Sequence, residues 1–324
     1  MMLILALCSH FSLSSANMPN AQTLIQQLGI QQQDVANLNQ GQIVFFNVAE
    51  SEEIELAAGA AMYLQASPSQ IMSYINNNGL ISIDTAVTAS GAIPSQATLA
   101  AFNGFNFQPG SNEATNFLAA TPGSQFNLST QEFQTIQAAN SAQPGAASQL
   151  YQTILLQRWQ AYRQNGLNGI APYDRGDGTE ANPGGELQTA TQNNSVLATY
   201  FPDLYNVWLN YPAALPAGAV EKLFWLNRQV QSRPTAVLVH RIIMNTANSG
   251  VILSRQFYAG HSYNSNQITV AFLPYLNGTL IFYANKTFTD QVGGFGSSFK
   301  HSIGEDKEQS DMTQLMNSFR NALQ

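Results

Sequence analysis

Four extended apolar runs in the last third of the chain form its strongest pattern. The runs are rich in β-branched and aromatic residues, and turn-type residues separate them, among them Asn277-Gly278, a typical hairpin signal. They lie at Val237 to Met244, Val251 to Tyr258, Gln267 to Leu273 and Thr279 to Lys286. Strands joined by turns this short pair with their neighbours, so the pattern predicts an antiparallel meander.

The end of the chain has a helical period instead. Its apolar positions are Met312, Leu315, Met316, Phe319 and Leu323. This spacing predicts an amphipathic helix that begins at Ser310 or an earlier residue. One apolar face with two methionines must pack against something, and the predicted sheet is the obvious candidate.

Two further strands and a helix are predicted near the start, at Gln42 to Val48, at Leu56 to Gln65 and from Pro68 onward. Ser67 and Gln70 have the spacing of a capping box, and Pro68 suits the first helical position. The acidic run Glu50 to Glu55 is interpreted as a solvated connection.

The middle of the chain is predicted to be mainly helical. Ser129 to Glu132 is a second capping box, and Ser148 to Gln164 has apolar residues on one helical side. Glu186 to Trp208 is predicted to be helical, after a glycine-rich loop at Gly169 to Gly185. Asn78 to Gly123 has no clear period and is predicted to be irregular, with short strands as the alternative.

Composition narrows the classes of function. Hydrophobic residues make up 44% of the 324 residues and charged residues only 10%, against about 25% in ordinary domains. The formal net charge is −7 and no basic stripe stands out, which argues against a nucleic-acid partner. No apolar run is long enough to predict a transmembrane span in a mature chain.

The N-terminus has the pattern of an export signal. Met2 to Leu7 is a short apolar core, and Ser14-Ser15-Ala16 predicts cleavage after Ala16. Cys8 is the only cysteine, and the bulky Leu7 before it argues against lipidation. The pattern favours a periplasmic or secreted protein, and the alternative is a buried N-terminal helix in a cytoplasmic one.

The order of elements resembles the START-like, helix-grip superfamily. The resemblance rests on a strand followed by Ala66-Ser67-Pro68-Ser69-Gln70-Ile71-Met72, and on the closing hairpin with its helix. It covers residues 42–76 and 222–324. It implies one α+β domain over residues 17–324, in which a curved antiparallel sheet grips the C-terminal helix and residues of about 125–211 form a helical insertion. A cavity for a lipid, sterol or other apolar molecule would lie between sheet and helix.

Two arginines alternate with apolar residues inside predicted strands. Arg255 shares a side with Val251 and Leu253, and Arg241 shares one with Val239 and Ile243. A buried charge needs a partner, so a ligand carboxylate or phosphate is one interpretation. The alternative is that each arginine pairs with an internal carboxylate such as Asp290 or Glu186, or faces solvent.

These patterns favour non-catalytic binding of a hydrophobic or amphipathic small molecule, with transient membrane contact during transport. The candidate ligand-binding residues are Arg158, Arg241, Arg255, Phe257, Tyr258, His261, Tyr263, Met316 and Phe319. The histidines have no metal-ligand spacing, and no metal or cofactor is expected.

Two other functions stay open. Gly260-His261-Ser262-Tyr263-Asn264 resembles the Gly-x-Ser-x-Gly elbow of serine hydrolases, with Asp290 and His301 following in the expected order. The elbow requires a strand, a turn and a helix, however, and here another predicted strand follows. The third hypothesis is a surface protein-interaction module with an Asn/Gln-rich face.

Overall fold

The structure is a computed structural model that describes residues 18–78, 80–108, 111–139, 144–246, 248–294 and 296–324. The predicted signal segment, residues 1–16 with Cys8, lies outside the described residues. Among the described residues, no helix is both long enough and apolar enough to cross a membrane.

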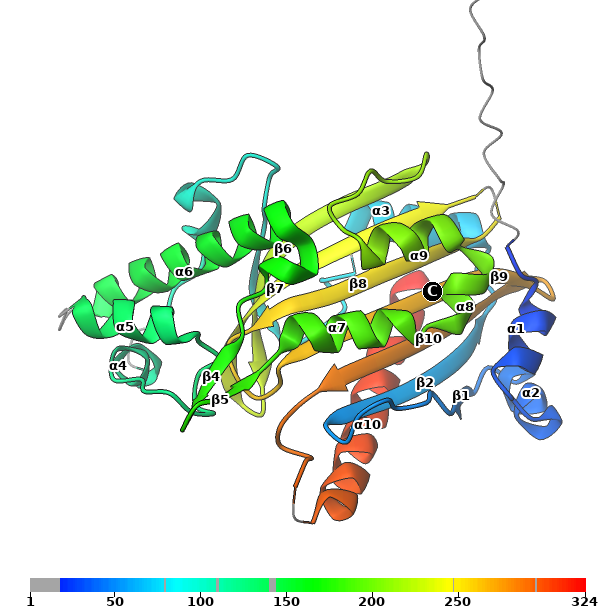
Figure 1. The fold of residues 1–324 in the computed structure, drawn as a ribbon. Helices are drawn as coiled ribbons and strands as arrows, with labels where there is room; N and C mark the ends of the chain where they lie inside the picture. The colour runs from blue at the N-terminus through cyan, green and yellow to red at the C-terminus, as the bar shows by residue number, and fades with distance from the viewer. Residues whose placement is uncertain (1–17, 79, 109–110, 140–143, 247, 295) are drawn as a thin grey trace, which may run out of the picture.

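A curved, open antiparallel sheet of eight strands organises the fold, in the order β1-β2-β10-β9-β8-β7-β6-β3 (Figure 1). Its strands are β1 (Ile43–Phe46), β2 (Glu55–Leu64), β3 (Val87–Ala92), β6 (Ala219–Val230), β7 (Arg233–Asn245), β8 (Gly250–Ala259), β9 (Ser265–Tyr275) and β10 (Gly278–Phe288). Strands β7 to β10 are the predicted meander, which is confirmed.

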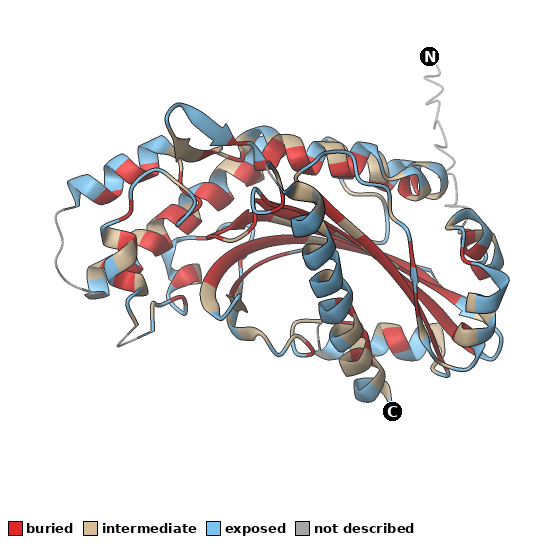
Figure 2. Ribbon diagram, turned by 90° about the horizontal axis from the view of Figure 1, so that it is seen from below, coloured by how far each residue is buried: buried red, intermediate tan, exposed pale blue. Residues whose placement is uncertain are grey.

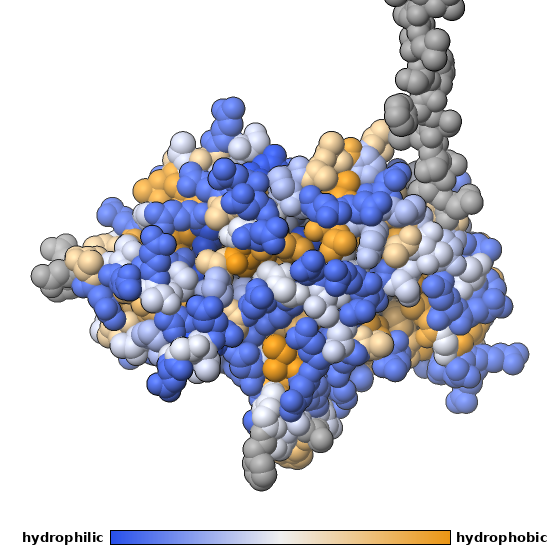
Figure 3. Space-filling model, in the orientation of Figure 1, coloured by the Kyte–Doolittle hydropathy of each residue, from blue (hydrophilic) through white to orange (hydrophobic). Residues whose placement is uncertain are grey.

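Helices cover both faces of the sheet, and the predicted α+β class is confirmed. The concave face carries α3 (Pro68–Asn78) and the long C-terminal helix α10 (Ser297–Leu323), as Figure 2 shows. The convex face carries α6 (Pro144–Asn165), α7 (Pro183–Gln192), α8 (Ser195–Tyr200) and α9 (Pro202–Leu209). The surface over this convex layer is mostly hydrophilic, with small separate hydrophobic patches (Figure 3).

Smaller elements complete the two ends. Helices α1 (Ala21–Gln27) and α2 (Gln32–Asn39) pack beside the β1 end of the sheet. Helices α4 (Glu113–Leu118) and α5 (Thr130–Ala138) lie near α6 at the opposite end.

The predicted helix caps are present. The Ser67 amide donates to Gln70 Oε1 at 2.8 Å, and the Gln70 amide donates back to Ser67 Oγ at 3.3 Å. Ser129 and Glu132 form the second capping box. Side-chain acceptors satisfy backbone amides that would otherwise be unpaired, so the sequence predicts where both helices begin.

Helix α10 begins at Ser297, well before the predicted start near Ser310. Its early turns are mostly exposed, so an apolar period does not mark them. It crosses close to β2, where a Cβ added at Gly304 would lie 2.7 Å from Leu56 Cδ1. Glycine therefore permits the approach of helix to sheet.

Two connections differ from the prediction. The loop predicted at Gly169 to Gly185 contains a hairpin of β4 (Tyr173–Gly176) and β5 (Thr179–Ala181). Its turn is Asp177-Gly178, and both residues have positive φ, 53° and 74°. The segment predicted to be irregular does contain a short strand, β3, but it also contains a 3₁₀ turn at Leu99–Phe102 and helix α4, neither of which was predicted.

The β9–β10 hairpin is confirmed, but its two turn residues are Leu276 and Asn277. Gly278 already pairs with Tyr275 as the first residue of β10. A Cβ at Gly278 would lie 2.1 Å from the Leu64 carbonyl oxygen, so glycine is needed here for the close approach of β2.

A row of buried polar residues joins the convex face to its helices. His240, Arg255, Gln267 and Lys286 are successive partners across β7 to β10. Gln267 Oε1 accepts from Trp208 Nε1 of α9 and from Thr191 Oγ1 of α7, both at 2.9 Å. These bonds hold α7 and α9 on the sheet.

The same row corrects the interpretation of the acidic run. Glu55 is fully buried and forms an ion pair with Lys286, so the end of Glu50 to Glu55 is not solvated. The lysine of the neighbouring strand supplies the partner that burial of a carboxylate requires.

Glu186 of α7 gives a pH-dependent stability. Its two carboxyl oxygens accept from Asn264 Nδ2 at 2.9 Å and from Ser265 Oγ at 2.7 Å. Burial raises the pKa of Glu186 from 4.5 to about 7, although these two hydrogen bonds act in the opposite direction. The folded state therefore holds an extra proton between those values.

We expect the stabilisation from protonated Glu186 to be complete below pH 4.5 and to be lost as the pH rises through 7. In Glu186→Gln this titration is absent. The free energy of unfolding of the wild type minus that of the variant should fall by about 3 kcal/mol from pH 4.5 to pH 8. Urea denaturation of both proteins across this range measures the difference, and a pH-independent difference would contradict the assignment.

Candidate functional site

The concave face of the sheet borders a series of open cavities, together with α3, α10 and residues 80–95, and Arg163 and Glu221 line the outer edge of the first of them. Three cavities of about 450, 140 and 510 Å³ adjoin one another along this face. The first and second share Ile75 and Arg241, and the second and third share Tyr283 and Leu315. We call the whole series the concave cavity.

A register row crosses the floor of this cavity. Its members are Lys222, Arg241, Ser254, Ile268 and Asn285, each paired with the next across β6 to β10. The row lies one residue away from the buried polar row of the convex face. Because side chains alternate between faces, the two rows point in opposite directions.

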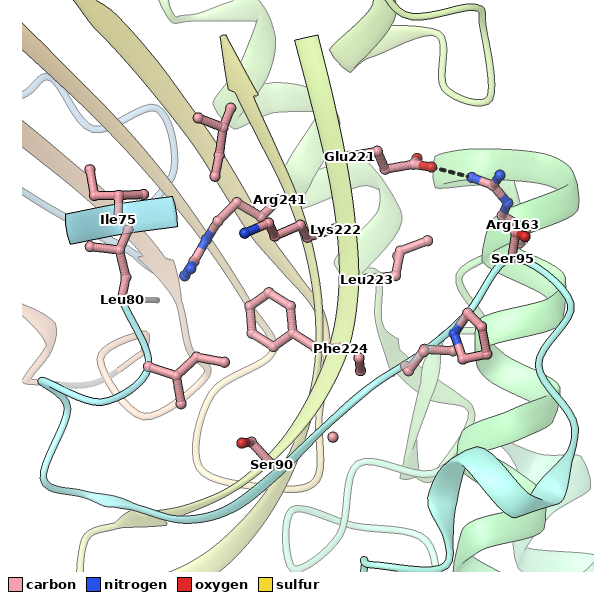
Figure 4. Close-up of a pocket in the computed structure, with 16 residues that line it drawn as sticks. Ile75, Leu80, Ser90, Ser95, Arg163, Glu221, Lys222, Leu223, Phe224 and Arg241 are labelled. Atoms are coloured by element: carbon pink, nitrogen blue, oxygen red, sulfur yellow. Dashed lines mark hydrogen bonds and ion pairs between the residues drawn. The ribbon is translucent and has the colours of Figure 1, made fainter. Parts of the chain in front are cut away.

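Two cations occupy one end of the concave row, the exposed Lys222 and the half-buried Arg241. Lys222 and Arg241 are direct cross-strand partners and lie side by side in Figure 4. Like charges in such positions repel each other. The Arg241 guanidinium carbon lies 5.0 Å from the centre of the Phe224 ring, and its buried Nε has no hydrogen-bond partner among the described residues.

No carboxylate of the described chain forms an ion pair with these two cations. Glu221 points to the other side of β6, toward α6, as Figure 4 shows. There it accepts from Arg163 at 2.7 Å and lies 3.1 Å from His240 Nε2. Burial lowers the pKa of Arg241 to about 10, which still leaves the guanidinium charged at neutral pH.

The middle of the cavity is apolar. Its walls include Ile252, Val270 and Phe272 of the sheet, with Met316 and Phe319 of α10. The one other arginine that lines this part, Arg228, forms an ion pair with Asp84 at 2.8 Å. Apart from Arg241, the described lining residues of the middle therefore offer apolar surface and no unpaired charge.

The far end is polar. Its arginine, Arg228, pairs with Asp84, and of its two lysines Lys307 pairs with Asp311 while Lys300 donates to the Gly293 carbonyl. This end also includes Gln256, Tyr263, Asn266, Asn285, Thr287 and Glu308. Glu308 of α10 accepts from Thr287 Oγ1 at 2.7 Å and from Asn285 Nδ2. Burial raises the pKa of Glu308, and these two hydrogen bonds act against that shift.

Four residues of the sequence-based set line the concave cavity: Arg241, Tyr263, Met316 and Phe319. Tyr263 lies at the polar end and donates to Gln256 Oε1. Sequence reasoning missed Lys222, the Asn266–Asn285–Thr287 group and Glu308. The available signal was the alternation of Lys222 with Phe224, which places both side chains on the same face of a strand.

The other five lie elsewhere. Arg255 is fully buried on the convex side, where it donates to the Trp208 carbonyl and stacks 3.8 Å from the Trp208 ring centre. Phe257 stacks on Tyr162 with 4.0 Å between ring centres. His261, in the β8–β9 connection, contacts Thr235 Oγ1 through Nε2 at 2.8 Å.

Arg158 and Tyr258 belong to the interface of α6 with the sheet. Arg158 pairs with Glu132, the internal carboxylate of the second capping box, and its guanidinium carbon lies 4.4 Å from the Tyr258 ring centre. The Tyr258 hydroxyl contacts the Tyr151 hydroxyl at 2.9 Å. These contacts fasten the helical layer to the sheet.

The three hydrolase candidates have separate partners. Ser262, with φ 72°, lies in the β8–β9 connection, and its hydroxyl contacts His261 Nδ1 at 2.7 Å. Asp290 accepts from Arg175 at 2.7 Å and from Asn264 at 3.0 Å. His301 contacts the Glu53 carbonyl and lies 3.6 Å from Glu50.

One group of potential metal ligands is present among the described residues. The ligand atoms of Glu50, His301 and Glu305 lie within 4.8 Å of one another. Both glutamates are exposed, and His301 Nε2 already contacts the Glu53 carbonyl oxygen.

Searches against protein-family models and against curated protein sequences found no match to this chain. The resemblance to the helix-grip superfamily therefore stays a prediction.

The two arginines should respond in opposite ways to loss of charge. Arg241→Met removes a cation without an ionic partner and keeps a long apolar side chain. We expect the free energy of unfolding to rise by about 1 kcal/mol. Arg255→Met leaves the Trp208 carbonyl without its donor. This change should lower the free energy of unfolding by about 3 kcal/mol. Urea denaturation of the ligand-free proteins measures both, and equal destabilisation would contradict this distinction.

Proposed function

We propose that this protein binds an amphipathic, lipid-like small molecule in the concave cavity and does not transform it. The observation that carries the proposal is the pair Lys222 and Arg241, two cations without ionic partners at one end of an apolar cavity. An anionic head group would supply the charge that the described chain does not. Its apolar body would lie along Ile252, Val270 and Met316.

The dimensions and chemistry of the cavity support binding of this kind. Small-molecule sites typically have volumes of roughly 300–1,000 Å³ and a few polar groups in an apolar lining. The first and third cavities measure about 450 and 510 Å³. Methionines on α10 suit an adaptable wall because their side chains are flexible and polarizable. A carrier of this kind would contact a membrane transiently while loading.

A pair of amphiphiles that differ only in head-group charge tests the proposal. We expect the wild type to bind dodecanoate and to bind dodecyltrimethylammonium at least about tenfold more weakly, since a charge-assisted hydrogen bond contributes about 1.5–3 kcal/mol. Arg241→Met should lose about tenfold in dodecanoate affinity, measured by isothermal titration calorimetry.

Arg320→Met is the matched control. It removes the same charge from α10, where Arg320 donates to the Gly41 carbonyl at 2.7 Å and does not line the cavity. Its affinity for dodecanoate should equal that of the wild type. Equal losses in both variants, or no preference for the anion, would contradict a charged anchor at Arg241.

Native mass spectrometry of protein purified from its own host, followed by organic extraction, addresses the natural ligand. We expect a lipid-sized mass that is absent from Arg241→Met. A ligand-free mass together with no uptake from a lipid mixture would overturn the proposal and favour the protein-interaction hypothesis.

Export to the periplasm or the exterior is a separate proposal and rests on the N-terminal sequence pattern alone. N-terminal sequencing of the mature protein should begin at Asn17. An intact residue 1 in protein from its own host would contradict it.

A further inference from the structure

The polar end of the concave cavity contains a hydrogen-bond chain with a defined direction. It begins at Glu308 of α10, whose oxygens accept from Thr287 Oγ1 at 2.7 Å and from Asn285 Nδ2. An ionised carboxylate can only accept hydrogen bonds. Both sheet residues must therefore direct their donors at Glu308.

This direction passes to Asn266 on the next strand. Because the Asn285 amide nitrogen faces Glu308, its Oδ1 is the acceptor that faces β9. Asn266 Nδ2 donates to that oxygen at 2.7 Å and to Thr287 Oγ1 at 2.9 Å. The network thus settles which end of the Asn266 amide is nitrogen and which is oxygen.

The chain ends in an acceptor without a donor. Asn266 is only 6% exposed, and its Oδ1 has no hydrogen-bond partner among the described residues. Asn266 lines the 510 Å³ part of the cavity. Buried polar atoms in folded proteins are nearly always hydrogen-bonded, so Oδ1 is the acceptor here that a donor from a bound molecule would satisfy.

Gln256, the cross-strand partner of Asn266, narrows the chemistry of that molecule. Gln256 Oε1 already accepts from the Tyr263 hydroxyl, so the amide nitrogen is the group that Gln256 offers to a ligand. A hydroxyl can donate to Asn266 and also accept from Gln256. An ammonium group has no acceptor to offer Gln256.

The two polar ends of the cavity lie at a distance that one ligand molecule can span. Asn266 is on β9, two strands from Arg241 on β7, and lies two residues along from the register row of Arg241. With strands about 4.8 Å apart and a rise of about 3.4 Å per residue, the two backbone positions are about 12 Å apart. The apolar part of the cavity borders both ends.

We propose that the ligand has two polar ends: an anionic group at Lys222 and Arg241, and a hydroxyl that donates to Asn266 Oδ1. Its class is a hydroxylated amphipathic acid with an apolar body between the two groups. This inference rests on the proposed function and specifies its ligand.

The test compares dodecanoate with ω-hydroxydodecanoate, and ω-hydroxyoctanoate and ω-hydroxyhexadecanoate bracket the length. In calorimetry, the hydroxyl should strengthen binding to the wild type about fivefold for the acid whose length lets it reach Asn266. A gain of this size is what one net hydrogen bond contributes. Asn266→Leu should abolish this gain and leave binding of plain dodecanoate within about twofold. Gln256→Met should also reduce the gain in affinity that the hydroxyl gives. Because Gln256 is not part of the hydrogen-bond chain from Glu308, this variant replaces Asn266→Leu if the latter does not fold.

The outcomes separate the two proposals. If dodecanoate binds and the hydroxyl gives no gain at any length, the two-ended ligand is overturned while the anionic site stands. Tighter binding of ω-aminododecanoate than of ω-hydroxydodecanoate would overturn the hydroxyl assignment. If neither plain nor hydroxylated acids bind, the proposed function itself fails.

Discussion

The pairing register of β6 to β10 decides which environment each buried charge of the sheet meets. His240, Arg255, Gln267 and Lys286 form one register row, and Arg241 belongs to the adjacent row on the opposite face. Helices cover the convex row and bring partners to Arg255 and Gln267, and strand β2 brings Glu55 to Lys286. A slip of one residue would exchange the two rows and leave the helical layer without its anchors.

The concave face, in contrast, has polar and charged groups without partners in the described chain. Lys222 and Arg241 repel each other without a carboxylate of the described chain to neutralise them, and Asn266 Oδ1 lacks a donor among the described residues. Arg241 and the buried Asn266 Oδ1 lower the stability of a ligand-free fold, whereas the exposed Lys222 stays hydrated. A site that is pre-organised for a ligand often has this character, because the ligand completes what the chain leaves open.

Helix α10 is both a wall of the cavity and part of its chemistry. Met316 and Phe319 face the apolar middle, and Glu308 orients the asparagines at the polar end. Gly304 lets the helix approach β2 closely. The same helix therefore sets the shape of the apolar part and the hydrogen-bond direction of the polar part, and a change in its position would alter both.

The sequence by itself determined the local elements: the meander, the two capping boxes and the apolar face of α10, because strand period, caps and helical spacing depend on near neighbours. It also placed Arg241 and Met316 among the ligand-binding candidates. Only the tertiary structure decided that Arg255 lies beneath helices, that Lys222 lies beside Arg241, and that Asn266 ends a chain begun by Glu308. These facts depend on the cross-strand register and on the packing of distant helices, which a pattern of near neighbours does not encode.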